Sequence, residues 1–211
     1  MGGPGRQSRP GRSEVAAHIS TAGYSFVELL FVAAATATLA GAAIPQVLTT
    51  VDDFRTASAA RHISARLQRA RMEAVKRSGD VGLQVVQAVD GYSYAVYLDG
   101  NRNGVRTKEI QSGIDRPLAA SERLFDLFNG VDFGAIPNVP SVDPGGTPPG
   151  ADPIRLGAGN LATFAAAGTS SSGSLYIRGR RNTQYVVRIY GQTGKTRVLK
   201  YDIRTKQWQP L

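Results

Sequence analysis

A single carboxylate, Glu28, interrupts an otherwise uncharged apolar run that extends from Gly23 to Pro45. An ionised carboxylate at membrane depth costs roughly 2.5–3.5 kcal/mol on insertion scales, so such a residue usually has a partner or a task. The chemistry open to Glu28 is ion pairing with a cation in a medium of low dielectric constant. The plain alternative is that a charge so near the start of the run is tolerated because it reaches the membrane interface.

The segment DGNRNG, residues 99–104, contains a second group of residues that could bind an ion. Three oxygen-bearing residues occupy alternate positions, as at the start of a calcium-binding loop: Asp99, Asn101 and Asn103. The position where such a loop needs a bidentate acid is Ile110, and Glu109 stands one residue early. The sequence therefore favours a hairpin turn between two strands over a metal site.

Lysine and arginine dominate the last 41 residues, where nine of them stand against one acid. The candidate anion-binding residues are Arg178, Arg180, Arg181, Lys195 and Arg197. Alternate residues of a strand share a face, so we expect Lys195 and Arg197 to project together. Such cations attract phosphates, and nearby tyrosines could stack on exposed bases, which makes DNA a candidate partner. Alternatively, these cations solubilise a surface or face anionic lipid or acidic partners.

Enzymatic chemistry finds little support in the sequence. The chain has no cysteine, and its two histidines, His18 and His62, have no metal-ligating or catalytic companions nearby in the sequence. The serines of residues 168–174 lack a base and predict a flexible loop. We therefore predict no enzyme, no cofactor and no metal, and keep a membrane-anchored exported hydrolase as a remote alternative.

The element that must position Glu28 is a helix long enough to cross a bilayer. The 20 residues from Tyr24 to Ala43 would span about 30 Å at about 1.5 Å per residue. Residues 1–22 carry three arginines against one acid, so the positive-inside bias predicts a cytoplasmic amino terminus and an exported remainder. An ordinary cleaved signal is the rival interpretation, because the end of the run offers small-residue cleavage sites.

Beyond Pro45, apolar residues recur at steps of three and four, and the opposite face is rich in arginine. This pattern predicts an amphipathic helix over residues 46–79 whose apolar stripe lies on a sheet. Pro45 removes an internal hydrogen bond and is expected to kink or locally melt the helix. Gly79 is expected to end the helix in the left-handed conformation.

The chain from residue 80 to residue 211 predicts a β-rich globular domain. Six runs have the composition of strands: VGLQVVQA, YSYAVYLD, RLFDLF, SLYIR, TQYVVRIYG and TRVLKYDI. Residues 137–153 are rich in proline and glycine and are expected to form a long mobile surface loop. A helix followed by strands predicts an α+β fold.

The segment GYSFVELL, which begins at Gly23, resembles the prepilin leader and cleavage motif of type IV pilins and pseudopilins. The resemblance implies that residues 1–23 are a leader, that prepilin peptidase cuts after Gly23, and that Tyr24 becomes the N-methylated terminus. It implies that residues 24–45 remain as the transmembrane and assembly helix. Glu28 would then pair with the terminal amine of a neighbouring subunit, and removing one member of such a buried pair costs about 3–5 kcal/mol.

The C-terminal region, from FAAAGTSSSGS to VLKYD, resembles that of the FimT and general secretion pathway protein H (GspH) family. The resemblance implies a pilin-like fold, in which a long N-terminal helix packs on an antiparallel β-sheet. It implies a minor pilin or pseudopilin of a type II secretion system or a type IV pilus. The expected partners are prepilin peptidase, other pilin or pseudopilin subunits, the assembly platform and the bacterial inner membrane, which the chain crosses once with its domain in the periplasm.

The FimT branch adds an alternative function, DNA binding during uptake, associated with a Gly-Arg-x-Arg turn near the C-terminus. This chain has Gly194, Lys195, Thr196 and Arg197 at that place. Lysine cannot make the planar bidentate contact of arginine, so general phosphate attraction is expected to survive the change better than a geometry-specific contact.

Overall fold

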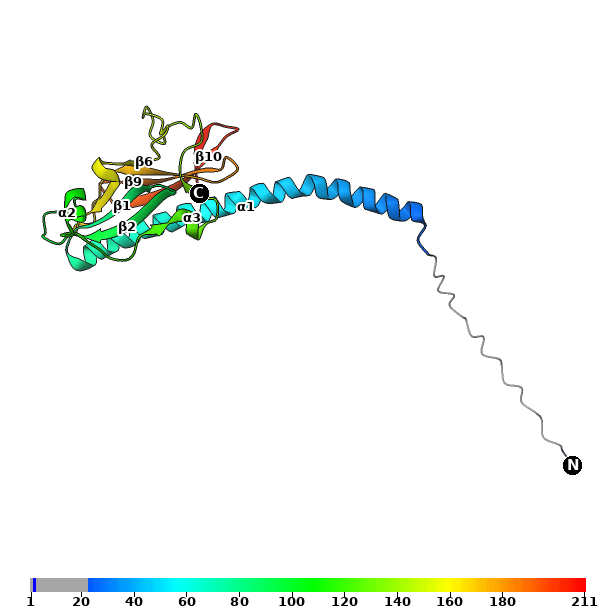
Figure 1. Ribbon diagram of the computed structural model, residues 1–211, viewed down its shortest axis with the longest axis horizontal. Coiled ribbons are helices and arrows are strands. Elements are labelled where there is room, and N and C mark those ends of the chain that lie inside the picture. Colours follow the sequence, from blue (N-terminus) through cyan, green and yellow to red (C-terminus); the bar gives the residue numbers. More distant parts are fainter. Residues whose placement is uncertain (1, 3–22) are drawn as a thin grey trace. The chain divides into compact units, whose positions relative to one another are not determined.

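The computed structural model describes residue 2 and residues 23–211 (Figure 1). It divides into two units, the first ending at Ile44 and the second extending from Pro45 to Leu211. One helix, α1 (Phe26–Arg77), contributes to both units. The predicted leader, apart from Gly2 and Gly23, lies outside the described residues.

Helix α1 contains Pro45 without a break in its helical assignment, so the backbone does not melt there. The hydroxyls of Thr49 and Thr50 donate to the Gln46 carbonyl at 2.8 and 3.0 Å. The helix ends one residue earlier than the glycine-cap expectation: Ser78 (φ 50°) takes the left-handed conformation, and Gly79 does not. Because α1 ends at Arg77, the left-handed position that commonly follows a helix is Ser78.

Two antiparallel sheets form the rest of the second unit. Sheet A contains β1 (Val81–Ala88), β2 (Gly91–Leu98), β3 (Arg116–Pro117), β4 (Glu122–Arg123) and β7 (Leu161–Phe164). Sheet B contains β5 (Asp132–Phe133), β6 (Ile154–Leu156), β8 (Gly173–Arg178), β9 (Gln184–Tyr190), β10 (Lys195–Asp202) and β11 (Gln207–Pro210). Every strand pairing is antiparallel. The short helices are α2 (Thr107–Ser112), α3 (Leu124–Leu127) and η1 (Ala158–Asn160).

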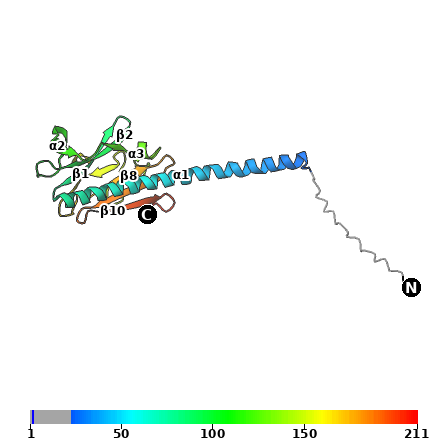
Figure 2. The same ribbon diagram turned by 90° about the horizontal axis from the view of Figure 1, so that it is seen from below.

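The core lies between both sheets and the part of α1 that belongs to the second unit (Figure 2). Buried apolar residues of α1 recur at steps of three and four, with Ala59 beside them: Ala57, Ala60, Ile63, Leu67, Ala70 and Ala74. Burying a side chain such as Ile63 or Leu67 contributes roughly 1.5–3 kcal/mol, so this stripe fastens the helix to the sheets. The predicted α+β fold, a long helix followed by an antiparallel sheet domain, is confirmed, and the strands divide between two sheets.

Five of the six predicted strands are present. The sixth, a strand over RLFDLF, is wrong. Only its first residue is in a strand, and Leu124–Leu127 form α3. A helical turn brings Leu124 and Phe128 to the core together and leaves Phe125 exposed. The apolar residues of this run have no strict period of two, so they fit a turn of helix better than a strand.

The predicted hairpin turn at residues 99–104 is also wrong. Strand β2 does pair with β3, but α2 lies between them. The carboxylate of Asp115, which is 1% exposed, accepts the backbone N–H groups of Gly100 and Arg106 at 3.0 and 2.9 Å. This distant acid closes the connection, so a two-residue turn is not needed.

Residues 137–153 contain no helix or strand and contact the outer face of sheet B. Val139 is buried against Tyr201, and the Val142 N–H donates to the Tyr176 hydroxyl at 3.0 Å. The Asp143 carboxylate pairs with Arg188 at 2.9 Å. These contacts give the loop a defined position on the sheet, and its mobility stays a prediction.

Candidate functional site

The start of α1 presents its apolar side chains to the outside. Gly23, Tyr24 and Ser25 precede the helix, and Glu28 lies in its first turn. Glu28 is exposed and has no hydrogen bond or ion pair within the part of the chain that the structure describes. A carboxylate in a first turn is favourable for the helix dipole.

The same helix passes the test for a membrane span by length and composition. Its most apolar window has a mean hydropathy of 1.9, and none of that window is buried. The large apolar side chains exposed in the first unit are Tyr24, Phe26, Val27, Leu29, Leu30, Phe31, Val32, Leu39 and Ile44. A single copy therefore leaves this surface to lipid or to other chains.

The turn at residues 99–104 is closed by hydrogen bonds. Asp99 accepts the N–H groups of Asn101, Arg102 and Gly104 at 2.7–3.1 Å. Burial opposes the ionisation of Asp99, but these backbone donors outweigh it and hold its pKa below the usual range. The amides of Asn101 and Asn103 donate to Glu109, and no group of three potential metal ligands occurs among the described residues.

The five candidate cations form two separate groups rather than one patch. Arg178 is opposite Gln184 at one end of β9, whereas Lys195 is opposite Tyr190 at the other end. Six residues of strand separate these positions, or about 20 Å at about 3.3 Å per residue. Arg180 and Arg181 follow β8 and belong to the first group.

The second group, Lys195 and Arg197, projects from β10 as the strand period predicts. Thr196 between them points to α1, where its hydroxyl lies 2.6 Å from that of Ser64 and 3.1 Å from the Gln68 amide nitrogen. Gln68 also donates to the Gly194 carbonyl. The helix thus anchors this turn by its inner face and leaves the two cations exposed.

Sequence reasoning did not include Arg188 in this group. The register places Arg188 directly opposite Arg197, and its guanidinium lies 5.8 Å from the Tyr190 ring centre. These residues line a groove of about 590 Å³. Among the described residues, Lys195 and Arg197 have no ion pair, whereas Arg188 is paired with Asp143. The period of two predicts which residues of β9 and of β10 share a face. The sequence does not give the register that places Arg188 opposite Arg197.

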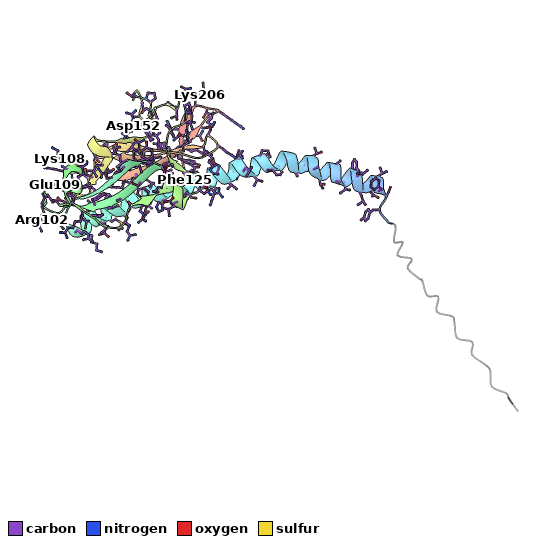
Figure 3. The ribbon with its side chains drawn as sticks, in the orientation of Figure 1. Arg102, Lys108, Glu109, Phe125, Asp152 and Lys206 are labelled. Atoms are coloured by element: carbon purple, nitrogen blue, oxygen red, sulfur yellow. The ribbon has the colours of Figure 1, made fainter. Side chains whose placement is uncertain are left out.

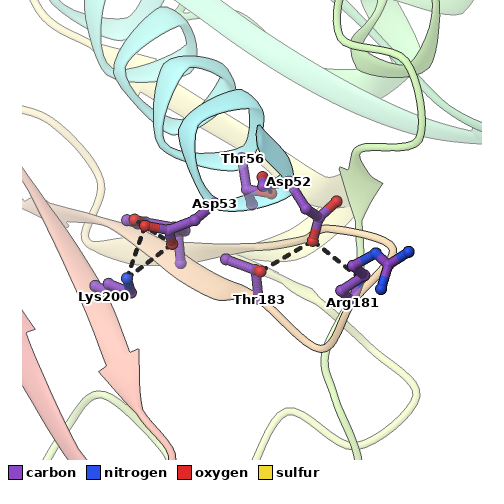
Figure 4. A network of polar contacts seen from close by, with 7 residues as sticks. Asp52, Asp53, Thr56, Arg181, Thr183 and Lys200 are labelled. Carbon is purple, nitrogen blue, oxygen red and sulfur yellow. Dashed lines mark hydrogen bonds and ion pairs between the residues drawn. The ribbon is translucent and has the colours of Figure 1, made fainter. Parts of the chain in front are cut away.

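The first group is tied to α1 through its backbone. Asp52, which is 7% exposed, accepts the N–H groups of Arg180 and Arg181 at 3.0 and 2.9 Å and the Thr183 hydroxyl at 2.9 Å (Figure 4). The neighbouring Asp53 pairs with Lys200 at 2.8 Å. Two consecutive helix acids therefore hold sheet B, and the guanidinium of Arg181 stays free to face outward.

His62 has companions that the sequence did not indicate. Its Nε2 lies 3.0 Å from the Tyr94 hydroxyl, which donates to Glu122 at 2.9 Å, and Arg66 also contacts Glu122. Burial together with Glu122 raises the pKa of Tyr94. Burial opposes the ionisation of Glu122, but Arg66 and Tyr94 outweigh it and lower its pKa. This network joins α1 to sheet A.

The serines of residues 168–174 make structural contacts. The Ser171 hydroxyl accepts the Thr163 N–H at 3.0 Å, and the Ser172 hydroxyl accepts the Gly191 N–H at 3.1 Å. The contacts connect the segment before β8 with β7 and with the turn after β9.

Comparison with known proteins gives one family. A family model described as type II transport protein GspH matches residues 59–193. No curated protein matches the chain. A solved structure of the minor pseudopilin EpsH from the Type 2 Secretion System of Vibrio cholerae is similar at 14% identity and a TM-score of 0.42, over 69% of this chain and 97% of that chain. At this level the structural likeness adds nothing to the family match.

Proposed function

Because the chain belongs to the family of type II transport protein GspH, we propose that it is a minor pseudopilin that works in a type II secretion system after processing at Gly23. The family is a structural, non-enzymatic component of the secretion system, so the expectation that the chain is not an enzyme is confirmed. The hydrolase alternative is thereby dropped. A type IV pilus is the less favoured setting, because the matching family is one of type II transport.

Processing at Gly23 is supported by the conformation around it. Gly23, Tyr24 and Ser25 lie outside the helix, where a peptidase can reach the backbone. Cleavage there by prepilin peptidase would leave a Tyr24 amine, to be methylated, close to the first turn that holds Glu28.

The observation that carries the assembly role is the unpartnered state of Glu28. In the described part of one copy this carboxylate has no cation, although it lies in an apolar helix. The Tyr24 amine of another pseudopilin subunit would supply that cation, and the exposed apolar residues of the first unit would pack between copies. The span over residues 24–43 would hold the chain in the inner membrane, with the second unit in the periplasm, until the assembly platform extracts it.

The test compares Glu28→Gln with Thr36→Val in a secreting cell. Thr36 is a matched control on the same helix, because its hydroxyl bonds only to backbone carbonyls of its own helix. We expect both variants to reach the membrane fraction at parental levels. Only Glu28→Gln should lose cross-linking to other pseudopilins, by roughly 100-fold if a buried pair is broken. Parental cross-linking by Glu28→Gln would overturn the assembly role.

DNA binding is the second candidate function, and the exposed pair Lys195 and Arg197 beside Arg188 favours it. Arg178 lies about 20 Å away along β9, and Arg180 and Arg181 follow it in the β8–β9 turn, so the candidate DNA site contracts to the groove near Gly194. Neutralising Lys195 and Arg197 should flatten the dependence of DNA affinity on salt. Unchanged binding by the double variant would exclude this groove as the DNA site.

A further inference from the structure

A second groove, of about 640 Å³, lies at the end of the second unit where the chain enters from the first unit. It is bordered by Thr49 and Thr50 of α1, by the β8–β9 turn and by the end of β10. The charged residues that line it are Asp53, Arg181, Lys200, Asp202 and Arg204. Cations outnumber acids here, although the groove lies beside two helix acids.

The helix acids do not neutralise Arg181 and Arg204. Asp53 is paired with Lys200 at 2.8 Å, and the carboxylate of Asp52 is occupied by two backbone N–H groups and a hydroxyl. Asp202 accepts the backbone N–H of Arg204 at 2.8 Å. Neither guanidinium forms an ion pair within the described residues, so two planar donors remain for an anion.

The position along the chain indicates which anion is available. Thr49 and Thr50 follow Ala43, the end of the proposed span, by six and seven residues, or about 10 Å of helix. The polar headgroup layer of a bilayer leaflet is roughly 5–8 Å thick. About 10 Å of helix exceeds this layer by only a few ångströms, a gap that long arginine side chains can bridge, so lipid phosphates are the anions within reach when the span is in the membrane.

Neighbouring residues fit a membrane interface as well. Ile203 is 55% exposed beside Arg204, and the next turn carries Lys206. Lys206 and Phe125, which is 46% exposed, lie at the same end of the second unit, away from Arg102 and Glu109 (Figure 3). Cations interspersed with exposed apolar side chains are typical of surfaces that bind anionic lipid.

We propose that this groove binds the phosphate of an anionic lipid headgroup through Arg181 and Arg204, and so docks the second unit on the membrane before assembly. The inference rests on the proposed anchorage by residues 24–43. It assigns Arg181, which the sequence grouped with a DNA surface, to lipid. Extraction into a pseudopilus would have to break this contact.

The experiment uses the full chain in nanodiscs of phosphatidylcholine alone or mixed with phosphatidylglycerol. Because the chain has no cysteine, Gln207→Cys gives a single exposed labelling site near the groove. Energy transfer to a headgroup-labelled acceptor reports how closely the second unit approaches the lipid. We expect stronger transfer with phosphatidylglycerol, which falls to the phosphatidylcholine value at high salt.

Two double variants that remove equal charge decide the site. Arg181→Gln with Arg204→Gln keeps the backbone N–H that Asp52 accepts and should weaken docking roughly 30-fold. Lys195→Gln with Arg197→Gln should leave docking unchanged. Unfolding curves that match the parent in both variants show that the second unit is intact.

The outcomes separate this contact from the anchorage. Comigration with both disc types but equal energy transfer would overturn the headgroup contact alone, whereas failure to comigrate would overturn it together with the anchorage. Equal loss by the two double variants would also contradict the proposal. The proposal is also contradicted if Arg181→Gln with Arg204→Gln weakens binding to duplex DNA and leaves the approach to lipid unchanged.

Discussion

The carboxylate of Asp52 accepts the backbone N–H of Arg181 at 2.9 Å, although 129 positions separate the two residues. Asp52 lies in α1 seven residues after Pro45, and Arg181 lies in the turn between β8 and β9. The same carboxylate also accepts the backbone N–H of Arg180 and the hydroxyl of Thr183. The contact therefore fixes the start of the second unit to sheet B, so that force on the helix reaches the sheet.

Asp52→Ala should lower the free energy of unfolding of the second unit by about 3 kcal/mol, because it removes the charged acceptor of three part-buried hydrogen bonds. Lys200→Gln is the matched control, since it removes only the partly exposed ion pair with Asp53, and such pairs contribute about 0–1 kcal/mol. Urea unfolding of the full chain in nanodiscs measures both. Equal effects would show that Asp52 is not the main attachment.

Gly194→Ala should destabilise the second unit more than Gly145→Ala does. Both glycines have positive φ, so each alanine costs roughly 1–2 kcal/mol. A methyl group on Gly194 would also lie 2.6 Å from the Gly168 carbonyl oxygen, whereas Gly145 has open space. Displacement of the Gly194 turn should weaken any anion contact of Lys195 and Arg197. The prediction fails if the two unfolding midpoints shift equally.

Stability should depend on pH through Glu122. Because its pKa is lowered in the folded chain, the stabilising contribution is present above the unfolded pKa of about 4.3 and is lost as pH falls through the folded pKa. Glu122→Gln should remove this part of the acid limb and leave the part contributed by Glu73, whose pKa is lowered by its hydrogen bond from Arg77. Unfolding curves recorded between about pH 6 and pH 3 measure the difference. A parental acid limb in Glu122→Gln would refute the assignment.

If the groove beside Gly194 binds DNA, Asp143→Asn should strengthen that binding. The change releases Arg188 from its 2.9 Å ion pair and adds a third cation to Lys195 and Arg197. The slope of log affinity against log salt should steepen by about one unit. Arg188→Gln is the control and should leave the slope at the parental value. An unchanged slope in Asp143→Asn would exclude Arg188 from the site.

The large elements follow from local patterns in the sequence. The 3.6-residue period that places Ile63 and Leu67 on one stripe predicts the second part of α1, and the β-branched and aromatic runs predict β1, β2, β8, β9 and β10. The errors occur where distant groups decide the conformation. The buried carboxylate of Asp115 closes the connection that contains α2, and the core contacts of Leu124 and Phe128 turn a strand-like run into α3.

The candidate sites divide in the same way. Glu28 and the Gly23 motif are local signals, so the sequence is sufficient to nominate them. The separation of Arg178 from Lys195 and the addition of Arg188 depend on strand register, which composition does not encode. The occupation of Asp52 by backbone N–H groups, which frees Arg181, is likewise visible only in three dimensions.

The central claim is that this chain is a pseudopilin processed at Gly23. Mass spectrometry of the N-terminal peptide of the membrane-extracted protein tests that claim most directly. The account predicts a mature chain that begins at Tyr24 with a methylated amine and retains Glu28. A chain that begins after Ala40 or Ala43, or one that keeps residues 1–23, would contradict it.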